Sequence, residues 1–180
     1  KKAWEKAKEE LGKDEITIEL LTFDQDSAKT DAEYFQSQLE QNLDGLSLKI
    51  KQQPFKQKIA LEDKGQFEIG FSGWGADYPD PLSFLQILTT GNNQNSSGWS
   101  NPEYDKAIES AKGDLATKPE ERIKALQEAE ALMLKDAPVM PLYQTGAAYL
   151  QQPYIKDYHR HKFGVDFSLK TTSIEGKESK

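Results

Sequence analysis

The stretch FSGWGADYPDPLSFL, residues 71–85, combines glycines, aromatic rings and carboxylates in a way that could bind a ligand. Two glycines, Gly73 and Gly75, flank Trp74. Because glycine has no side chain, the backbone at these positions can approach a ligand closely and can adopt positive φ. We therefore expect a candidate binding site in this turn, with the indole ring beside backbone that is open to contact.

Asp77 is the candidate charged group of the turn, because it follows an apolar strand, and sheet folds commonly place ligand-binding groups there. Its carboxylate could accept charge-assisted hydrogen bonds from an ammonium group, and Trp74 and Tyr78 could supply apolar walls and a cation–π face. The residues are equally compatible with a rigid turn that has Trp74 in the core. In that case Asp77 or Asp80 would cap a helix beginning near Leu82, and the Asp-Pro sequence favours Asp80 as the cap.

Asp77 and Asp80 could also be the carboxylate pair of a carbohydrate-active enzyme. Such a pair must be held roughly 5–9 Å apart on opposite sides of the bond that is cleaved. Two aspartates three residues apart in a proline-rich turn do not readily take opposed positions, so this alternative is the weaker one. A screen for glycosidase turnover separates it from a binding protein, which should show none.

Metal and cofactor chemistry has little support in the sequence. The only histidines, His159 and His161, would share one face of a strand, but they have no evident third ligand, and we expect them at the surface. Asp24 and Asp26 resemble the start of a calcium loop that lacks its glycine and terminal glutamate, so we interpret them as helix caps. Walker, dinucleotide-binding, GxSxG and HExxH motifs are absent. We predict a protein that is not an enzyme and has no metal or cofactor.

The composition excludes further kinds of site and partner. The 180 residues include no cysteine, which excludes disulfides, thiolate metal ligands and a cysteine nucleophile. The formal net charge of −7 argues against nucleic acid as a partner, because phosphate binding needs a basic surface. No run of apolar residues is long enough for a membrane-spanning helix. The length suits one large domain or two small ones.

The elements that would position the turn follow from the spacing of apolar residues. A first amphipathic helix ends at Gly12. Residues 16–50 form a strand–helix–strand unit, for which a right-handed parallel crossover is the default. A short helix up to about residue 63 then leads to a third strand over residues 67–71, directly before the glycine-flanked tryptophan. These elements together predict an α/β fold.

Later helices are predicted from their start signals. Asn101 precedes a proline and can cap a helix, and Thr117 and Glu120 have the spacing of a capping box. The apolar segment 139–144 is interpreted as short and buried. From residue 151 onward the periodicity fades, which is typical of a strand or tail that needs a partner to be fixed.

Several separated blocks resemble the C-terminal part of bacterial oligopeptide-binding proteins: GWGADYPDPLSFL, the asparagine-rich loop after it, GWSNPEYDKAI and PEERIKALQEAEALMLKDAPVMPLYQ. These proteins are the extracytoplasmic solute-binding subunits of peptide ABC importers, solute-binding protein family 5, in which two lobes close over an extended peptide. The resemblance implies a periplasmic-binding-protein-like type II lobe with a mixed sheet flanked by helices. It further implies that residues 1–150 are a peptide-binding, domain III-like lobe that lacks its N-terminal part, and that residues 151–180 return toward the missing lobe.

The resemblance also implies roles for individual residues. Asp77 matches the aspartate that holds the peptide's N-terminal ammonium group, and Trp74 matches a tryptophan of the cleft. Gly73 and Gly75 lie on the segment whose backbone forms hydrogen bonds with the peptide. Such bonds do not depend on the side chains of the peptide. Two apolar residues fall, by their spacing from Trp74, where the family lines its pockets. The predicted ligand-binding set is therefore Asp77, Trp74, Gly73, Gly75, Tyr78, Phe55 and Ile59.

One departure from the family pattern bears on the ligand. Some enterobacterial members use basic residues for the peptide's C-terminus at the positions of Glu62, Asp63 and Phe71, and this chain has none there. A fixed C-terminal anchor is therefore in doubt, and a longer or a signalling peptide is as plausible as a nutrient tripeptide. Relatives also handle dipeptides, nickel complexes, haem or pheromones, so a non-peptide ligand stays open as an alternative.

The resemblance implies two partners, an oligopeptide ligand and the membrane permease of an ABC transporter, with a monomeric binding protein and no nucleic acid. It implies a location outside the cytoplasm. The lysine-, glutamine- and asparagine-rich composition is similar to that of a Gram-positive member. For such a member the resemblance implies a cell-surface lipoprotein whose membrane anchor lies outside this chain, with a periplasmic protein as the alternative.

Overall fold

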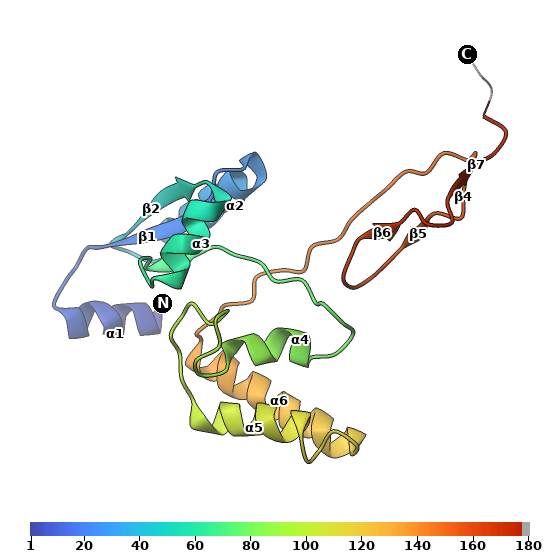
Figure 1. Ribbon diagram of the computed structural model, residues 1–180. Helices are drawn as coiled ribbons and strands as arrows, with labels where there is room; N and C mark the ends of the chain where they lie inside the picture. Colours follow the sequence, from blue (N-terminus) through green and yellow to red (C-terminus); the bar gives the residue numbers. More distant parts are fainter. Residues whose placement is uncertain (178–180) are drawn as a thin grey trace. The chain divides into compact units, whose positions relative to one another are not determined.

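The computed structural model describes residues 1–177, which divide into two compact units (Figure 1). Unit 1 contains residues 1–73 and 96–98, and unit 2 contains the other described residues. Each unit has a hydrophobic core of its own. The predicted boundary near residue 150, between a lobe and a returning segment, stays a prediction.

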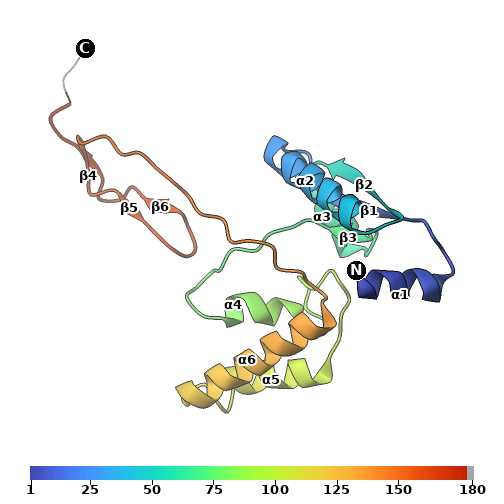
Figure 2. The same ribbon diagram turned by 180° about the vertical axis from the view of Figure 1, so that it is seen from behind.

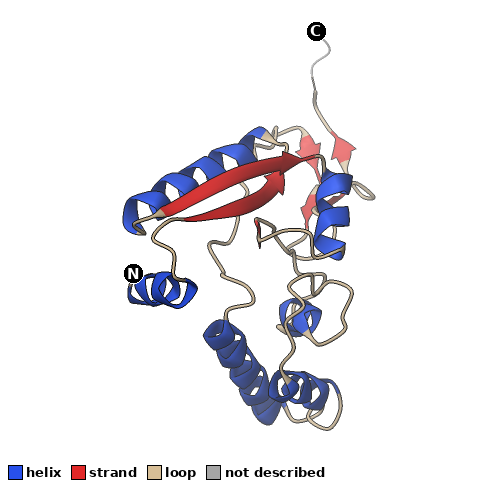
Figure 3. Ribbon diagram, turned by 90° about the vertical axis from the view of Figure 1, so that its left-hand side faces the viewer, coloured by secondary structure: helices blue, strands red, loops and turns tan. Residues whose placement is uncertain are grey.

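Unit 1 is built on a three-stranded parallel sheet with the order β2-β1-β3. Its long strands are the red arrows that lie side by side in Figure 3. The predicted strand–helix–strand unit is confirmed, and its two strands pair in parallel from Ile16 with Leu46 to Phe23 with Gln53. The third strand is shorter than predicted, since only Ile69 and Gly70 pair with β1 as a strand. The elements of this unit are α1 (Lys2–Leu11), β1 (Ile16–Phe23), α2 (Asp26–Asn42), β2 (Leu46–Gln53), α3 (Phe55–Asp63) and β3 (Ile69–Gly70).

Helices α2 and α3 lie on opposite faces of this sheet. Leu20 of β1 packs with Ala32 of α2 in the core of unit 1. Phe23 of β1 stacks on Phe55 of α3, with ring centroids 5.5 Å apart. Side chains alternate between the two faces of a strand, so Leu20 and Phe23, three residues apart, point in opposite directions. The sheet is therefore covered on both faces, as expected for parallel strands.

The ends of α1 and α2 test the predicted helix signals. Gly12 ends α1 in the left-handed conformation, with φ of 62°, as predicted. The prediction that Asp24 and Asp26 cap α2 is wrong, because Gln25 is the N-cap residue and its side chain makes no capping hydrogen bond. Asp26 is instead the first helical residue, where its charge favours the positive end of the helix dipole.

A buried ion pair joins α3 to the chain that leaves β3. Lys58 has no exposed surface, and its Nζ lies 2.5 Å from Glu62 Oε1 and 2.5 Å from Ser72 Oγ. Ser72 Oγ in turn donates to Glu62 Oε1 at 2.9 Å, and the Lys58 ammonium lies 4.3 Å from the centroid of the Phe23 ring. A Cβ added to Gly70 would lie 2.8 Å from Glu62 Oε1, so a side chain there would displace the carboxylate.

Unit 2 is a small helical assembly followed by two short antiparallel hairpin pairings. Helices α5 and α6 pack side by side (Figure 2), and Tyr104, fully buried between helices, donates its hydroxyl to Leu85 O at 2.5 Å. The predicted cap at Asn101 is confirmed, since its Oδ1 accepts from the N–H groups of Glu103 and Tyr104. The elements are α4 (Leu82–Leu85), the 3₁₀ helix η1 (Gln86–Leu88), α5 (Pro102–Lys112), α6 (Pro119–Asp136), β4 (Ile155–Lys156), β5 (His159–Arg160), β6 (Phe167–Ser168) and β7 (Ser173–Ile174).

Two expectations for unit 2 are wrong. The capping box of Thr117 and Glu120 does not form, because α6 begins at Pro119 and the N-cap residue is therefore Lys118, one residue later than the box requires. The segment 139–144 is exposed rather than buried, with Met140 66% exposed. An apolar run shows that a segment is suited to burial, but it does not identify the surface that would cover it. None of the helices within residues 1–177 has the length and apolar character needed to cross a bilayer.

The buried ion pair gives a stability prediction. Lys58→Met leaves the Glu62 carboxylate buried with only the Ser72 hydroxyl, which should destabilise unit 1 by about 3–5 kcal/mol. Hydrogen exchange of the β1 amides reads the stability of this unit directly. The matched control is Lys56→Met on the exposed face of α3, expected to change stability by less than about 0.5 kcal/mol. Equal effects of the two substitutions would show that the ion pair is not stabilising, and Lys58→Met/Glu62→Gln should recover most of the loss.

Candidate functional site

The turn that follows β3 holds its tryptophan at the surface. Trp74 is 41% exposed, so the alternative that placed this ring in the core is not what the structure shows. The indole Nε1–H donates to Ser83 O at 2.8 Å, which fixes one edge of the ring to α4 and leaves the rest of the ring available for contact. Neither Gly73 nor Gly75 adopts the positive φ that glycine permits. A Cβ at either glycine would meet no atom within 4 Å, so the backbone there is open.

The carboxylate of Asp77 is exposed, and it has no hydrogen bond or ion pair to any of residues 1–177. Its backbone N–H is held, because it donates to Ser83 Oγ at 2.7 Å. The neighbouring Tyr78 is 39% exposed and accepts a hydrogen bond from Gln86 Nε2 on its hydroxyl at 2.8 Å. The turn therefore presents one unpaired negative charge beside an accessible indole and a phenol, which is the arrangement that an ammonium group would need.

Asp80 differs from Asp77 although it lies only three residues away. Its Oδ1 accepts the N–H of Leu82, the first residue of α4, at 2.9 Å, although the N-cap residue is Pro81 and not Asp80 as predicted. Arg122 of α6 binds both carboxylate oxygens, each at 2.9 Å, and also donates its Nε to Ala111 O. The hydrogen bond from Arg122 lowers the pKa of Asp80 below its ordinary 3.8, with partial burial opposing and the Leu82 bond assisting this shift.

Unit 1 contributes the remaining predicted residues, and each is described within that unit. Phe55 is the first residue of α3, is 62% exposed and stacks on Phe23. Ile59 lies one turn later and is half-buried. Both apolar side chains follow the carboxyl end of β2, and Gly73 follows the carboxyl end of β3. Parallel pairing brings these ends to one edge of the sheet, where α/β folds bind ligands.

Position 62 shows what the departure from the family pattern means physically. Glu62 is 8% exposed and accepts hydrogen bonds from Lys58 and Ser72, so it faces the interior of unit 1. Phe71 belongs to the partly buried side chains packed against the core of that unit. Neither position offers a positive charge to a ligand.

Sequence reasoning missed three residues of this region: Ser83, Arg122 and Lys58. Ser83 is 1% exposed and binds both Trp74 and Asp77, and Arg122 comes from a helix 42 residues away from Asp80. The spacing of Lys58 and Glu62, four residues apart on a predicted helix, was a usable signal for their ion pair. No local signal identifies the partners of Ser83 and Arg122, because those bonds depend on the tertiary fold.

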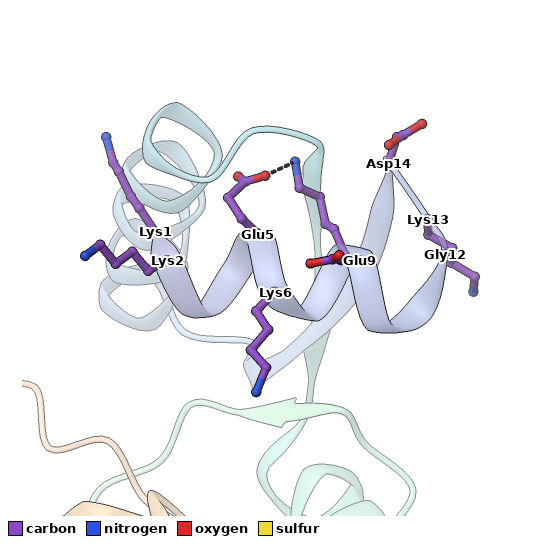
Figure 4. A pocket seen from close by; sticks show the side chains of 9 residues that line it. Lys1, Lys2, Glu5, Lys6, Glu9, Gly12, Lys13 and Asp14 are labelled. Atoms are coloured by element: carbon purple, nitrogen blue, oxygen red, sulfur yellow. Dashed lines mark ion pairs between the residues drawn. The ribbon is translucent and has the colours of Figure 1, made fainter.

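Two hollows lie in the surface of residues 1–177, and Asp77 lines neither of them. One of about 800 Å³ runs along α1 and is lined by charged side chains, among them Glu5 and Lys8, which pair at 3.1 Å (Figure 4). None of the seven predicted residues lines it, and solvated charges that pair with one another give no reason to expect a ligand. A second hollow of about 650 Å³ in unit 2 is lined by Tyr78, Asp80 and Arg122 among others, but not by Asp77.

The histidines do not form a metal site in the described part of the chain. His159 and His161 are both exposed, as expected. Within residues 1–177 no group of three or more histidine, aspartate or glutamate side chains is placed to hold a metal ion.

Comparison with known proteins decides the family. The sequence profile of the bacterial extracellular solute-binding proteins, family 5 (middle region), matches residues 1–96, which is more than half of the chain. The chain belongs to this family. A dipeptide-binding protein of Lactococcus lactis is 32% identical to this family 5 chain, and the match covers 97% of the chain and 32% of that protein.

Solved structures agree with the family. An oligopeptide ABC transporter substrate-binding domain from Bacillus anthracis matches with a TM-score of 0.88 and 38% identity, over 97% of this chain and 34% of that one. Listeria monocytogenes OppA bound to peptide matches with a TM-score of 0.83 and 37% identity, over 96% and 32%. The periplasmic-binding-protein-like fold predicted from the sequence is therefore confirmed. The chain spans about a third of the length of these relatives.

The ion pair of Asp80 gives a pH prediction for this family 5 chain. A carboxyl whose pKa is lower in the folded state adds stability at pH values above its ordinary pKa, and this stability is lost as the pH falls through the lowered value. Asp80→Asn should therefore destabilise unit 2 by about 1 kcal/mol at neutral pH. Between about pH 5 and pH 2, the unfolding free energy of Asp80→Asn should also fall less than that of the native protein.

Urea unfolding at a series of pH values measures this effect, with the exposed Asp114→Asn as the control. Parallel pH curves for the native protein and Asp80→Asn would show that Arg122 does not stabilise the charged carboxylate.

Proposed function

We propose that the chain is part of the peptide-binding subunit of an ABC importer, and that it helps to capture extended oligopeptides in a cleft between two lobes for delivery to a membrane permease. Its structural relatives support this, since one is the substrate-binding domain of an oligopeptide ABC transporter and another is bound to peptide. The family is extracellular and solute-binding, not enzymatic. A monomeric lipoprotein at the surface of a Gram-positive cell, or a periplasmic protein, fits this role.

The observation that carries the proposal is the free carboxylate of Asp77. In a turn where Trp74 and Tyr78 are accessible, one exposed and unpaired negative charge is suited to a peptide's N-terminal ammonium group. We assign Asp77 as the anchor of that group and Trp74, Tyr78, Phe55 and Ile59 as apolar contacts. The open backbone at Gly73 and Gly75 supplies hydrogen bonds that do not depend on peptide sequence.

For the carbohydrate-active alternative, Asp80 is not a suitable general acid. A glycosidase acid must keep its proton near neutral pH, which requires a raised pKa. Arg122 lowers the pKa of Asp80 instead and occupies both of its oxygens. Asp77 alone does not make a carboxylate pair. No observation on the described residues favours a nickel complex or haem over a peptide.

The role of Asp77 can be tested in a protein of the relatives' full length that contains this chain. Asp77→Asn should weaken the binding of a free-amine peptide by about 1.5–3 kcal/mol, the range of a hydrogen bond between charged groups. The same peptide with an N-terminal acetyl group should lose much less, because it carries no ammonium group. Isothermal titration calorimetry gives both affinities. Equal losses for the two peptides would contradict the anchor, and Asp114→Asn is a control at an exposed aspartate outside the predicted ligand-binding set.

The C-terminal end of the ligand should matter little. Glu62 and Phe71 present no positive charge, and the charge of Lys58 is already paired with Glu62. Amidation of the peptide's C-terminus, which removes its negative charge, should therefore change the dissociation constant by less than about threefold. A loss of tenfold or more on amidation would show that another part of the protein provides a carboxylate anchor.

A further inference from the structure

Ser83 occupies an unusual place among the polar residues of unit 2. It lies on the short helix α4 and is 1% exposed, although it is a small polar residue that ordinarily prefers the surface. A buried hydroxyl needs a hydrogen-bond partner, since a buried hydroxyl without one costs about 1–3 kcal/mol of stability. The partners of Ser83 therefore show which part of the structure its buried hydroxyl stabilises.

Both partners of Ser83 are residues of the turn that precedes it. Its hydroxyl Oγ accepts the backbone N–H of Asp77 at 2.7 Å. Its carbonyl oxygen accepts the indole Nε1–H of Trp74 at 2.8 Å. One buried residue thus fixes the backbone that carries the free carboxylate and the ring that lies beside it.

Ser83 is itself fixed by the core of unit 2. Its N–H donates to Asp80 O at 3.0 Å, and Asp80 is held by the two bonds from Arg122 of α6. Its neighbours on α4, Leu82 and Leu85, belong to the hydrophobic core that also contains α5 and α6. The position of Ser83 is therefore set by the packed helices of unit 2. The residues of the turn that bond to Ser83 are held in place relative to these helices.

In the part of the chain that the structure describes, few other bonds restrain the turn from Gly73 to Asp77, since the bonds of Tyr78 to Gln86 and of Asp80 to Arg122 come after it. Within residues 1–177, the backbone of Gly75 meets no neighbour at the position of an added Cβ, and Ala76 O accepts only a long hydrogen bond of 3.4 Å from Gly164. Without the hydroxyl of Ser83, the N–H of Asp77 would lose its partner and the backbone at Asp77 could rotate. The carboxylate would then sample many directions before a ligand arrives.

We propose that Ser83 is a positioning residue for ligand capture, which holds Asp77 and Trp74 in one fixed relative geometry through its hydroxyl and its carbonyl. This inference rests on the proposed role of Asp77 as the anchor of a peptide's ammonium group. A fixed anchor gains affinity because the ordering of the turn does not have to take place on binding.

The test compares Ser83→Ala, which removes the hydroxyl, with Ser83→Thr, which keeps it, in a protein of the relatives' full length that contains this chain. The readout is the ratio of the dissociation constants for an N-acetylated peptide and the same peptide with a free amine. Ser83→Ala should lower this ratio by about 5–30-fold, the equivalent of 1–2 kcal/mol, because the anchor acts only on the free amine. Ser83→Thr and the control Ser110→Ala should keep the native ratio.

The ratio separates positioning from stability. If Ser83→Ala lowers the melting temperature but leaves the ratio unchanged, Ser83 is only structural and the inference is overturned. If the native protein does not distinguish the two peptides, the proposed role of Asp77 fails first. A native protein that distinguishes them, together with an unchanged ratio in Ser83→Ala, contradicts the role of Ser83 alone.

A second measurement does not depend on whether the variants fold. Hydrogen exchange of the Asp77 amide in the native 180-residue chain reads the bond to Ser83 Oγ directly. Protection of at least about tenfold relative to an unstructured peptide is expected, since the bond must open before exchange. Exchange at the unstructured rate would overturn the inference.

Discussion

Parallel pairing along β1 is the constraint on which the arrangement of unit 1 depends. Since β1 has a parallel partner on each side, the carboxyl ends of all three strands lie at the same edge of the sheet. The chain leaves that edge into α2, into α3 and into the segment that contains Ser72 and Gly73. The buried pair of Lys58 and Glu62 then ties α3 to Ser72, so the chain that leaves β3 is fixed at its second residue by charge-assisted hydrogen bonds.

Asp77 and Asp80 show how tertiary contacts give two similar residues different chemistry. Asp80 is bonded by Arg122 and by the first turn of α4, so its charge is used within the protein. Among residues 1–177 Asp77 is bonded through its backbone only, so its charge stays available to a ligand. A ligand cation that reached Asp80 would have to compete with a guanidinium that already binds both carboxylate oxygens. Asp77 carries no such competitor among residues 1–177.

The sequence predicted the elements better than their contacts. The period of apolar residues identified β1, β2 and the helices, and Gly12 and Asn101 marked two helix ends correctly. The capping errors at Asp26 and Thr117 come from boundaries that differ by one or two residues, which a pattern cannot resolve. The segment 139–144 was misjudged because burial needs a covering surface, and hydrophobicity does not supply one. At the site, residue types pointed to Asp77 and Trp74, but Ser83 depends on a turn geometry that no spacing encodes.

The strength of the proposed anchor must depend on what covers it. An exposed carboxylate in contact with an exposed ammonium group contributes only about 0–1 kcal/mol, because water competes for both charges. A contribution of about 1.5–3 kcal/mol requires that the pair be taken out of water. In the described chain the Asp77 carboxylate is exposed, so further protein or the ligand itself must exclude that water. The relatives are about three times as long as this chain, so the proposed two-lobed protein has further residues that could provide that cover. Under that proposal a preformed turn and a closing lobe are complementary requirements: the first fixes where the charge lies, and the second determines how strongly it binds.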